Sequence, residues 1–364
     1  MTRPAPRHPK VSGPATLAAR RAVRESLADL PPGAHVLVAC SGGPDSLALA
    51  VTVAHLAPAA GWLARALVVD HGLREGSASE ARDVVARLDT IGLPATSVRV
   101  DADAGPGGPE ARARDARWAA LRAHADDPPV VILTGHTMDD QAETVLLGLA
   151  RGSGARSIAG MRAAEDGVRR PFLQLRRTQT VGVCDELGLV PLHDPTNAAD
   201  GPWRAADGSA LRRAAVRDRA LPALADALGV DPVPALARTA EQARRDDDAL
   251  TADAEALLDA ALHARADAAP TDNAGAPPHA HAPVLVLDVA TLAAAHPAVR
   301  SRALRAAGER AGWRPGDVKA AHLAALDALV TDYDGQGPTM LPGGVVARRA
   351  CGRLMLSRSE HQAD

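Results

Sequence analysis

The stretch Val36-Leu-Val-Ala-Cys-Ser-Gly-Gly-Pro-Asp-Ser46 decides the fold of this chain. Its apolar start, Val36 to Ala39, is typical of a buried strand, and Ser46-Leu-Ala-Leu-Ala-Val51 predicts the first turns of a helix. Gly42 and Gly43, in the turn between them, allow a phosphate to approach the backbone closely. A strand, a glycine turn and a helix N-terminus in succession present unpaired N–H groups and the positive end of the helix dipole to an anion.

The side chains of this turn suit a nucleotide. Ser41 and Ser46 offer hydroxyl groups, and Asp45 offers a carboxylate for a magnesium ion. The turn lacks the longer spacing and the Gly-Lys-Ser/Thr ending of the Walker loop. It is similar instead to the SGGxDS loop of the PP-loop ATP pyrophosphatases, which cleave ATP between the α and β phosphates and transfer AMP to an oxygen. That resemblance implies an ATP-binding loop made of Ser41, Gly42, Gly43, Pro44, Asp45 and Ser46.

Strand-like and helical patterns alternate after this loop. Further apolar runs at 65–70, 95–100 and 129–134 predict strands, and the segments 77–91 and 110–124 have helical spacing. Such alternation predicts an α/β fold, a Rossmann-like doubly wound parallel sheet with right-handed crossovers.

A chain of 364 residues is long enough for two domains. We expect a disordered tail at 1–13, a catalytic domain at 14–222 and a smaller, mainly helical C-terminal domain at 223–364 that binds tRNA. The Pro-, Ala- and His-rich stretch near 268–283 is expected to be a low-complexity insert in that second domain.

Charge and cysteine content exclude several classes of protein. The net charge is −3, so any nucleic-acid surface has to be a local patch, and the 39 arginines (41 basic residues less Lys10 and Lys319) are not functional by number alone. Cys40, Cys184 and Cys351 form no CxxC pair, which argues against a zinc or iron–sulfur site. The N-terminus has no signal-peptide pattern and no apolar run approaches membrane-spanning length, so we expect no membrane partner and a cytoplasmic protein.

Three polar segments follow predicted strands. They are Ser41–Ser46, Asp70–Arg74 and the start of a helix at His136–Glu143. Carboxyl ends of parallel strands share one edge of a sheet, where open α/β sheets bind ligands. Positions 136, 139, 140 and 143 are expected on one helical face. An acidic face beside an anion-binding loop suits either magnesium or a cationic substrate.

Five motifs in this order resemble the tRNA(Ile)-lysidine synthetase family within the PP-loop superfamily. They are Ser-Gly-Gly-Pro-Asp-Ser (41–46), Val-Asp-His-Gly-Leu-Arg (69–74), Glu-Ala-Arg-Ala-Arg (110–114), Gly-His-Thr-Met-Asp-Asp-Gln-Ala-Glu-Thr (135–144) and Asp-Pro-Thr-Asn (194–197). The resemblance is strong over about residues 15–222 and looser beyond. It implies a ligase that uses ATP and Mg²⁺ to join free L-lysine to the wobble cytidine of a tRNA(Ile) with a CAU anticodon. The base is adenylated, AMP is displaced by the lysine amine, and pyrophosphate is released.

The same resemblance assigns roles to individual residues. It implies that Asp45 holds magnesium, that Asp70 and His71 join the ATP loop, and that Asp140 and Glu143 bind lysine. Arg112 and His136 are implied as further catalytic residues that contact the substrate or its phosphates. For His136, a structural role at a strand end is the alternative.

The arginines after residue 210 are candidates for tRNA contact: Arg212, Arg213 and Arg217. The family has Arg-Asn-x-Ile/Val-Arg here, whereas this chain has Ala214 in place of the asparagine. A solvated basic face in an arginine-rich protein is the alternative interpretation.

Two other functions are weighed against this one. Another PP-loop enzyme, such as a tRNA thiolase or an amidating synthetase, is disfavoured by the missing CxxC pair and the missing glutaminase-type domain. A non-enzymatic nucleotide-binding module would have no need for Asp140 and Glu143. The sequence leaves a homodimer open as an alternative to a monomer.

Overall fold

The computed structural model describes residues 13–72, 76–101, 109–125, 130–152, 154–192, 198–201, 204, 208–263, 284–313 and 317–358. Contacts divide it into two compact units, Met1–Arg244 and Arg245–Asp364. Several expectations fall outside the described residues: the tail at 1–13 except for Gly13, the insert at 268–283, the motif at 194–197 and the end of the 69–74 motif.

A six-stranded sheet forms the centre of the first unit, with the order β3-β2-β1-β4-β6-β5. The first four strands, which are all parallel, are β1 (His35–Ala39), β2 (Leu63–Asp70), β3 (Ala95–Arg99) and β4 (Val130–Thr134). The short strand β6 (Val168–Arg169) continues this parallel set beside β4, and β5 (Ala164–Glu165) is antiparallel at the edge. The predicted Rossmann-like, doubly wound α/β sheet is confirmed.

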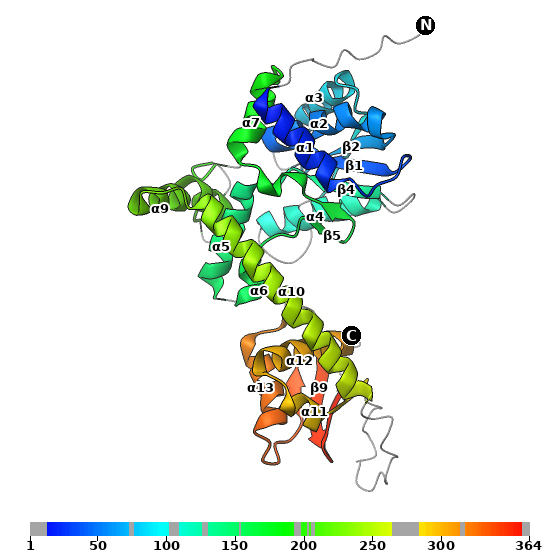
Figure 1. The fold of residues 1–364 in the computed structure, drawn as a ribbon, viewed down its shortest axis with the longest axis vertical. Helices are drawn as coiled ribbons and strands as arrows, with labels where there is room; N and C mark the ends of the chain where they lie inside the picture. Colours follow the sequence, from blue (N-terminus) through cyan, green and yellow to red (C-terminus); the bar gives the residue numbers. More distant parts are fainter. Residues whose placement is uncertain are drawn as a thin grey trace. The chain divides into compact units, whose positions relative to one another are not determined.

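Alternation along β1 explains why helices cover both faces of the sheet. Val36 and Val38 point into one core and Leu37 into the other, since successive side chains of a strand point to opposite faces. The first core is covered by α1 (Pro14–Ser26), α2 (Pro44–Ala60), α3 (Ser77–Thr90) and α7 (Arg177–Glu186), and the second by α4 (Pro109–Ala123). Figure 1 shows α1, α2 and α3 on one side of β1 and β2.

The later part of the first unit is helical. It contains α5 (Met138–Arg151), α6 (Ala155–Ile158), a 3-10 turn (Pro171–Gln174), α8 (Arg212–Ala215) and α9 (Leu221–Leu228). Helices α8 and α9 are separated by a π-helical segment, Val216–Ala220. Pro222 follows at the start of α9 and has no N–H to donate into the preceding turn, which explains the altered hydrogen-bond pattern.

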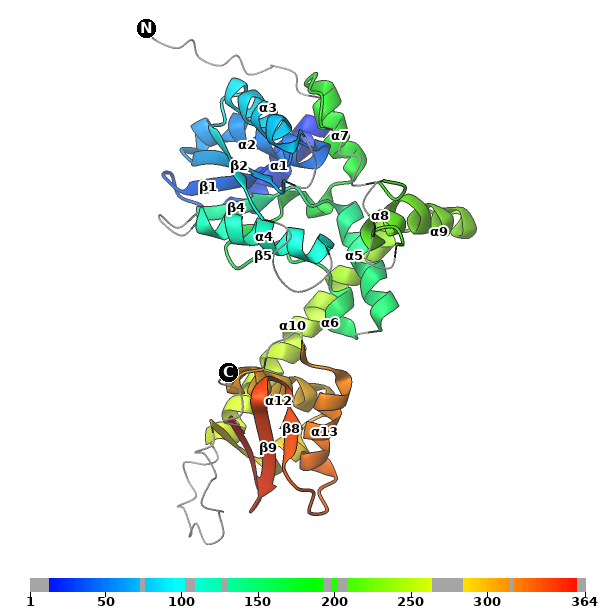
Figure 2. The ribbon, with the colours of Figure 1, turned by 180° about the vertical axis from the view of Figure 1, so that it is seen from behind.

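The second unit has a core of its own. Helix α10 (Val233–His263) contains the division at Arg244–Arg245, whereas the sequence placed the boundary at 222–223. The unit combines α11 (Val289–Ala294), α12 (Pro297–Ala311) and α13 (Ala320–Thr331) with a four-stranded antiparallel sheet of order β7-β10-β9-β8 (Figure 2). Its strands are β7 (Leu285–Asp288), β8 (Thr339–Leu341), β9 (Val345–Ala350) and β10 (Arg353–Arg358). Buried side chains of the helices and the strands pack into one cluster.

Within the described ranges, no single helix has the length and apolar character needed to cross a membrane. The segments 212–228 and 233–263 satisfy that test only when taken together, and they are bent by 102° at the break between them.

Candidate active site

The described parts of the three polar segments expected at strand ends, 41–46, 70–72 and 136–143, do meet at one edge of the sheet. Strand β1 lies between β2 and β4, and Ala39 at its carboxyl end pairs with Leu67 of β2 and Thr134 of β4. The ATP loop therefore follows the middle of three parallel strands, and the chain beyond β2 and β4 flanks it. This is the crevice where open α/β sheets bind nucleotides.

The loop at 41–46 is closed by its own side chains. Ser46 Oγ accepts a hydrogen bond from the Ser41 N–H at 3.1 Å and donates one to the Gly43 carbonyl at 3.1 Å. Gly42 has a φ of +84°, and a Cβ there would lie 2.6 Å from Val84. Any other residue at 42 would thus be strained and would clash. Helix α2 begins at Pro44, so its first N–H groups point into the loop.

Asp45 lies in the first turn of α2 and faces α7. Its carboxylate accepts hydrogen bonds from Thr180 Oγ1 and, at 3.2 Å, from Arg177 Nε. Burial raises the pKa of Asp45, although the charge of Arg177 and the Thr180 hydrogen bond act against this. The side chain of Asp45 is 22% exposed.

The start of α5 differs in detail from the expectation. Thr137 is the N-cap and α5 begins at Met138, so His136 precedes the helix and does not share a helical face with the three acids. Asp140 folds back and accepts hydrogen bonds from the Thr137 N–H at 2.7 Å and its hydroxyl at 2.8 Å. This is a capping box, which fixes the Asp140 carboxylate beside the strand end.

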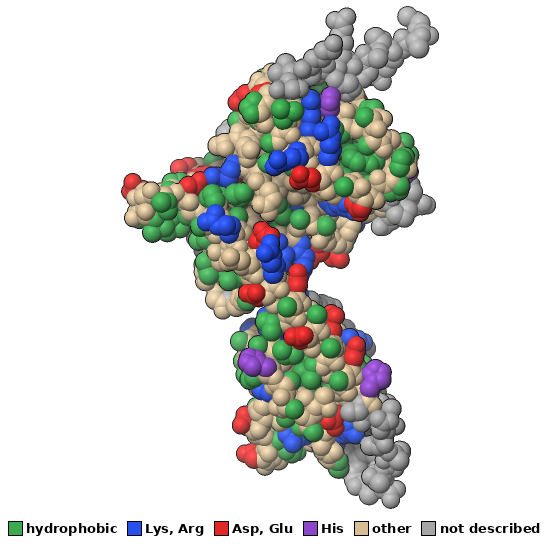
Figure 3. All heavy atoms as spheres, viewed as in Figure 1, with side chains coloured by type: hydrophobic (Ala, Val, Ile, Leu, Met, Phe, Trp, Pro, Cys, Tyr) green, Lys and Arg blue, Asp and Glu red, His purple; other side chains and the backbone are tan. Residues whose placement is uncertain are grey.

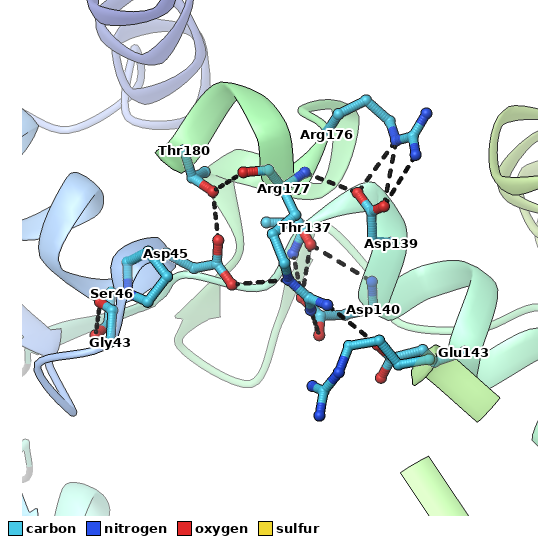
Figure 4. A network of polar contacts seen from close by, with 12 residues as sticks. Gly43, Asp45, Ser46, Thr137, Asp139, Asp140, Glu143, Arg176, Arg177 and Thr180 are labelled. Carbon is cyan, nitrogen blue, oxygen red and sulfur yellow. Dashed lines mark hydrogen bonds and ion pairs between the residues drawn. The ribbon is translucent and has the colours of Figure 1, made fainter. Parts of the chain in front are cut away.

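The guanidinium of Arg177 joins three carboxylates, and sequence reasoning missed it. Its Nε donates to Asp45, its NH2 lies 2.7 Å from Asp140 Oδ1, and its NH1 lies 3.3 Å from Glu143 Oε1. Figure 4 shows these carboxylates converging on Arg177 from α2 and α5. The backbone N–H of Arg177 also donates to Asp139 at 2.7 Å, and Asp139 in turn pairs with Arg176 at 3.0 Å. We call Asp45, Asp140, Glu143 and Arg177 the carboxylate cluster.

The carboxylate cluster perturbs the ionisation of its members in different directions. Burial opposes ionisation of Asp140, but the charge of Arg177 and the Thr137 hydrogen bonds more than offset it and lower its pKa. Burial and the charge of Asp140 raise the pKa of Glu143 to about 7. Burial works against the charge of Arg177, yet Asp140, Asp45 and Glu143 raise its pKa overall, so it stays a cation. Glu143 therefore titrates near neutral pH.

His136 is held as a neutral ring in basic surroundings. Its Nδ1 lies 2.9 Å from Thr134 Oγ1. Burial, together with the charges of Arg117, Arg170 and Arg114, lowers its pKa to about 3 against the effect of Asp140. Burial and the charges of Arg114 and Arg213 also lower the pKa of Arg117, to about 10. Cations that depress one another's pKa in this way favour a bound anion.

The other expected ATP-site residues occupy separate positions. Asp70 is 7% exposed at the end of β2, and its Oδ1 accepts the Gly72 N–H at 2.9 Å. His71 follows it directly. Arg112 lies on α4, which also carries Arg114 and Arg117, two of the three arginines whose charges act on His136.

The three candidate tRNA-binding arginines are not equivalent. Arg212 is exposed, Arg213 NH2 donates to Thr144 at 3.3 Å, and Arg217 pairs with Asp218 at 3.1 Å. Ala214 is 3% exposed, so the family's asparagine would point into the protein at this position. On the face drawn in Figure 3, basic side chains form separate groups interspersed with acids, as the net charge led us to expect.

A cavity of about 240 Å³ opens beside the carboxylate cluster. Acidic and basic side chains line it together: Asp139, Glu143 and Asp231 with Arg176, Arg177 and Arg217. Apolar residues of α9 and the start of α10 complete the wall, including Leu221 and Val233. Its volume lies below the roughly 300 Å³ at which sites for drug-sized molecules begin, and its mixed charge suits a small zwitterion.

The site offers a metal ion only a few side-chain ligands among the described residues. The described residues contain no group of three or more His, Cys, Asp or Glu side chains placed to hold a metal ion. Cys40 and Cys184 are buried, with Cys40 Sγ 3.7 Å from Ser46 Oγ and Cys184 Sγ 3.6 Å from the Pro44 carbonyl. Burial raises the pKa of both thiols, that of Cys184 to about 12. They pack beside the ATP loop as neutral groups.

Comparison with protein families identifies both parts of the chain. A model of the PP-loop domain matches residues 16–224, and a model of the TilS substrate binding domain matches residues 287–355.

Curated relatives match nearly the whole chain. The tRNA(Ile)-lysidine synthase of Salinispora arenicola is 45% identical over 347 residues, which cover 94% of this chain and 96% of the relative. The tRNA(Ile)-lysidine synthase of Thermobifida fusca is 44% identical over 340 residues, covering 93% of this chain and 96% of the relative. That of Streptomyces coelicolor is 44% identical over 331 residues, covering 90% and 86%.

Among solved structures, the chain is similar to a U34-tRNA thiolase from Methanococcus maripaludis with its 4Fe-4S cluster. The TM-score is 0.50 and the identity is 16%, over 64% of this chain and 78% of the other. This likeness shows a shared fold.

Proposed function

The chain belongs to the tRNA(Ile)-lysidine synthase family, and from that premise we propose how its residues ligate free L-lysine to the wobble cytidine of tRNA(Ile). ATP first adenylates the carbonyl oxygen of the cytosine, and pyrophosphate leaves. The lysine ε-amine then attacks the carbon that bears this oxygen. A C–N bond forms, the C–O bond breaks, AMP departs with the oxygen, and the nitrogen loses a proton.

The observation that carries the proposal is the carboxylate cluster beside the ATP loop. A loop for phosphates explains Asp45, but ATP alone gives no reason for Asp140 and Glu143 to lie across from it. A co-substrate with two amines gives such a reason, because each ammonium group favours a carboxylate partner. The adjacent cavity, with its acids and its arginines, is where we place lysine. Its carboxylate would lie toward Arg176, which also lines the cavity.

Glu143 is also suited to proton transfer. Its pKa of about 7 lets it accept a proton from the attacking nitrogen and release it to solvent near neutral pH. His136, kept neutral by burial, is suited to orient a phosphate or the adenylated base by a hydrogen bond. Arg112 stays a candidate for phosphate contact on α4, together with Arg114 and Arg117. Asp70 and His71 border the nucleotide from the end of β2.

Asp45 is suited to bind Mg²⁺ in the way that carboxylates usually bind it in nucleotide sites. Mg²⁺ is commonly bound by one or two carboxylates plus phosphate oxygens and water, so it does not need a cage of protein ligands. Asp45 supplies such a carboxylate at the helix start that borders the loop. The ion supplies charge neutralisation at the phosphates, while the backbone N–H groups of the loop orient them.

Arg212, Arg213 and Arg217 are the arginines that we assign to the tRNA backbone. Arg212 is the most accessible of the three. We assign the reaction to the cytoplasm, where tRNA is available, and leave the homodimer to be tested by measuring the mass in solution.

One assay tests the function. The full chain is incubated with ATP, Mg²⁺, labelled L-lysine and unmodified tRNA(Ile) bearing a CAU anticodon. Label should enter the RNA with one pyrophosphate released per lysine, and a tRNA with a different anticodon is the control. Absence of label from the RNA would refute the proposal. Sulfur incorporation instead would support the thiolase alternative, for which the buried Cys40 and Cys184 give no support.

Asp45→Asn tests the metal assignment. Asparagine keeps the shape of the side chain and an oxygen for Thr180 but removes the charge. Pyrophosphate release should fall by about 100-fold or more, the scale of losing one key electrostatic group. Asp185→Asn, an exposed change on α7, is the matched control. Full turnover by Asp45→Asn would contradict the assignment.

A further inference from the structure

Arg177 connects the two halves of the site that the proposed function keeps separate. One half is Asp45 with the ATP loop, on α2, and the other is Asp140 and Glu143, on α5. The three nitrogens of one guanidinium each pair with one of these carboxylates, at 3.2, 2.7 and 3.3 Å. Arg177 is the one cation of the carboxylate cluster.

The guanidinium occupies the position that suits a cationic substrate. Asp140 and Glu143 are proposed to receive an amine of lysine, yet in this structure both already pair with Arg177. An ammonium group that enters has to displace a guanidinium held by three partners. Arg177 is therefore an internal competitor for lysine as well as a stabiliser of the cluster.

The anchoring of Arg177 confines any movement to its side chain. Its backbone N–H is fixed by Asp139 and its carbonyl accepts a hydrogen bond from Thr180 at 2.8 Å. The same Thr180 hydroxyl also contacts the Asp45 carboxylate, so its single proton is shared between the two acceptors. The main chain at the start of α7 is thus held by both halves of the site, while the side chain is 23% exposed and borders the cavity. A change of rotamer releases the carboxylates without moving α7.

We propose that Arg177 is a positioning residue that makes lysine binding depend on the nucleotide, through exchange of the Asp45 carboxylate between Arg177 and Mg²⁺. This inference rests on the proposed function. When Asp45 turns to the metal, Arg177 loses one of its three partners and meets a new positive charge. Its hold on Asp140 and Glu143 weakens, and the lysine amine replaces it there. Without nucleotide, Arg177 keeps the cluster closed.

The exchange predicts positive coupling between the two ligands, and such coupling is reciprocal. Lysine should bind the wild-type protein roughly 10-fold more tightly when Mg²⁺ and a non-hydrolysable ATP analogue are present, within the usual range of 5- to 150-fold. The analogue should bind more tightly by the same factor when lysine is present. The measurement is calorimetric titration of the full chain with L-lysine, with and without Mg²⁺ and the analogue.

Arg177→Gln removes the competing cation. In this variant lysine should bind the nucleotide-free protein about as well as the loaded protein, so that the ratio of the two dissociation constants approaches one. Arg169→Gln is the matched control, since Arg169 pairs with Asp29 elsewhere in the same unit. Arg177→Lys keeps the positive charge, but an ammonium group pairs with fewer carboxylates at once than a guanidinium does. The ratio of the two dissociation constants should therefore lie between those of the wild type and Arg177→Gln. Arg177→Lys also keeps the test decisive if the glutamine variant does not fold.

The outcomes separate the two claims. If Arg177→Gln shows the same ratio of lysine dissociation constants as the wild type, the inference is overturned, whereas the proposal that the protein binds lysine stands. If Arg177→Gln does not fold, a wild-type ratio in Arg177→Lys has the same meaning. Equal lysine affinity in the wild type with and without nucleotide would also overturn it. A wild-type protein that binds the analogue but never binds lysine would overturn both the inference and the proposed function.

Discussion

Gly135 lies directly against the main chain of Asp45. A Cβ built at Gly135 would be 2.8 Å from the Asp45 carbonyl oxygen and 3.0 Å from the Ser46 nitrogen. The chain leaving β4 therefore touches the first turn of α2 where the ATP loop becomes a helix. The absence of a side chain at 135 allows the halves of the site to approach this closely.

Gly135→Ala should push these segments apart. Overpacking of this kind typically costs about 1–3 kcal/mol of stability, and the displaced loop should bind an ATP analogue more weakly. Urea denaturation and titration with a fluorescent ATP analogue measure the two effects. Gly337→Ala is the control, because a Cβ there meets nothing within 4 Å. Equal analogue affinity in Gly135→Ala and the wild type would show that the close approach has no bearing on the loop.

Ser46→Ala should loosen the ATP loop. Ser46 Oγ bonds both to the Ser41 N–H and to the Gly43 carbonyl. At about 1 kcal/mol net for each bond, the loss corresponds to roughly 10- to 30-fold in affinity for the ATP analogue. Ser79→Ala removes a comparable hydroxyl bond, at the start of α3, and should leave affinity unchanged. An unaltered dissociation constant in Ser46→Ala would mean that the backbone alone closes the loop.

Glu143 should make stability fall as the pH rises. Its pKa is raised from 4.5 to about 7 by burial and by Asp140, so the folded protein keeps a proton that the unfolded chain has lost in this window. The free energy of unfolding then decreases from about pH 4.5 to 7, by roughly 3 kcal/mol for a shift of this size. Glu143→Gln removes the contribution, so its melting temperature should change less between pH 5 and pH 8 than that of the wild type.

The exposed Glu165→Gln serves as the control for that comparison. The same carboxyl also predicts that lysine binding strengthens as the pH rises through about 7, because Glu143 has to ionise to pair with an ammonium group. Calorimetric titration at pH 6 and pH 8 measures this. An identical pH response of stability in Glu143→Gln and the wild type would assign the effect to another group.

Arg212 should contribute to tRNA affinity through charge alone. Removing one phosphate contact reduces the slope of log K against log salt by about 1. Arg212→Ala should show that reduction in filter-binding measurements across a salt series. Arg219→Ala is a matched control on the same stretch, because Arg219 already pairs with Asp200 at 2.5 Å. Equal slopes for Arg212→Ala and the wild type would remove Arg212 from the interface.

Local patterns were sufficient to predict the sheet, the turn between β1 and α2, and the place of the acids that follow β4. Each of these depends on residues close together in the chain, such as the apolar run of β1 and the glycines after it. Arg177 could not be found in this way. Its partners lie 132, 37 and 34 residues away, and only the folded sheet brings them together. An arginine doublet also carries little information in a chain with so many arginines.

Details of geometry escaped prediction for similar reasons. The pattern suggested that His136 shares a helical face with the acids, but Thr137 caps the helix one residue later. Between α8 and α9 the chain stays helical, but Pro222 alters the hydrogen bonding before it. In both cases a single residue changed the end of an element that periodicity alone would extend.

The two buried thiols beside the ATP loop give the unmodified protein a built-in reporter of loop opening. Thiol reagents attack the thiolate, which Cys40 and Cys184 rarely form while they are buried. Cys351 is exposed and should react first. The rate of the slower labelling that follows then reports how often the segment around Pro44 and Ser46 opens and exposes the two buried thiols. A nucleotide that holds this segment in place should lengthen the slow phase, so alkylation rates can time the opening without an added dye.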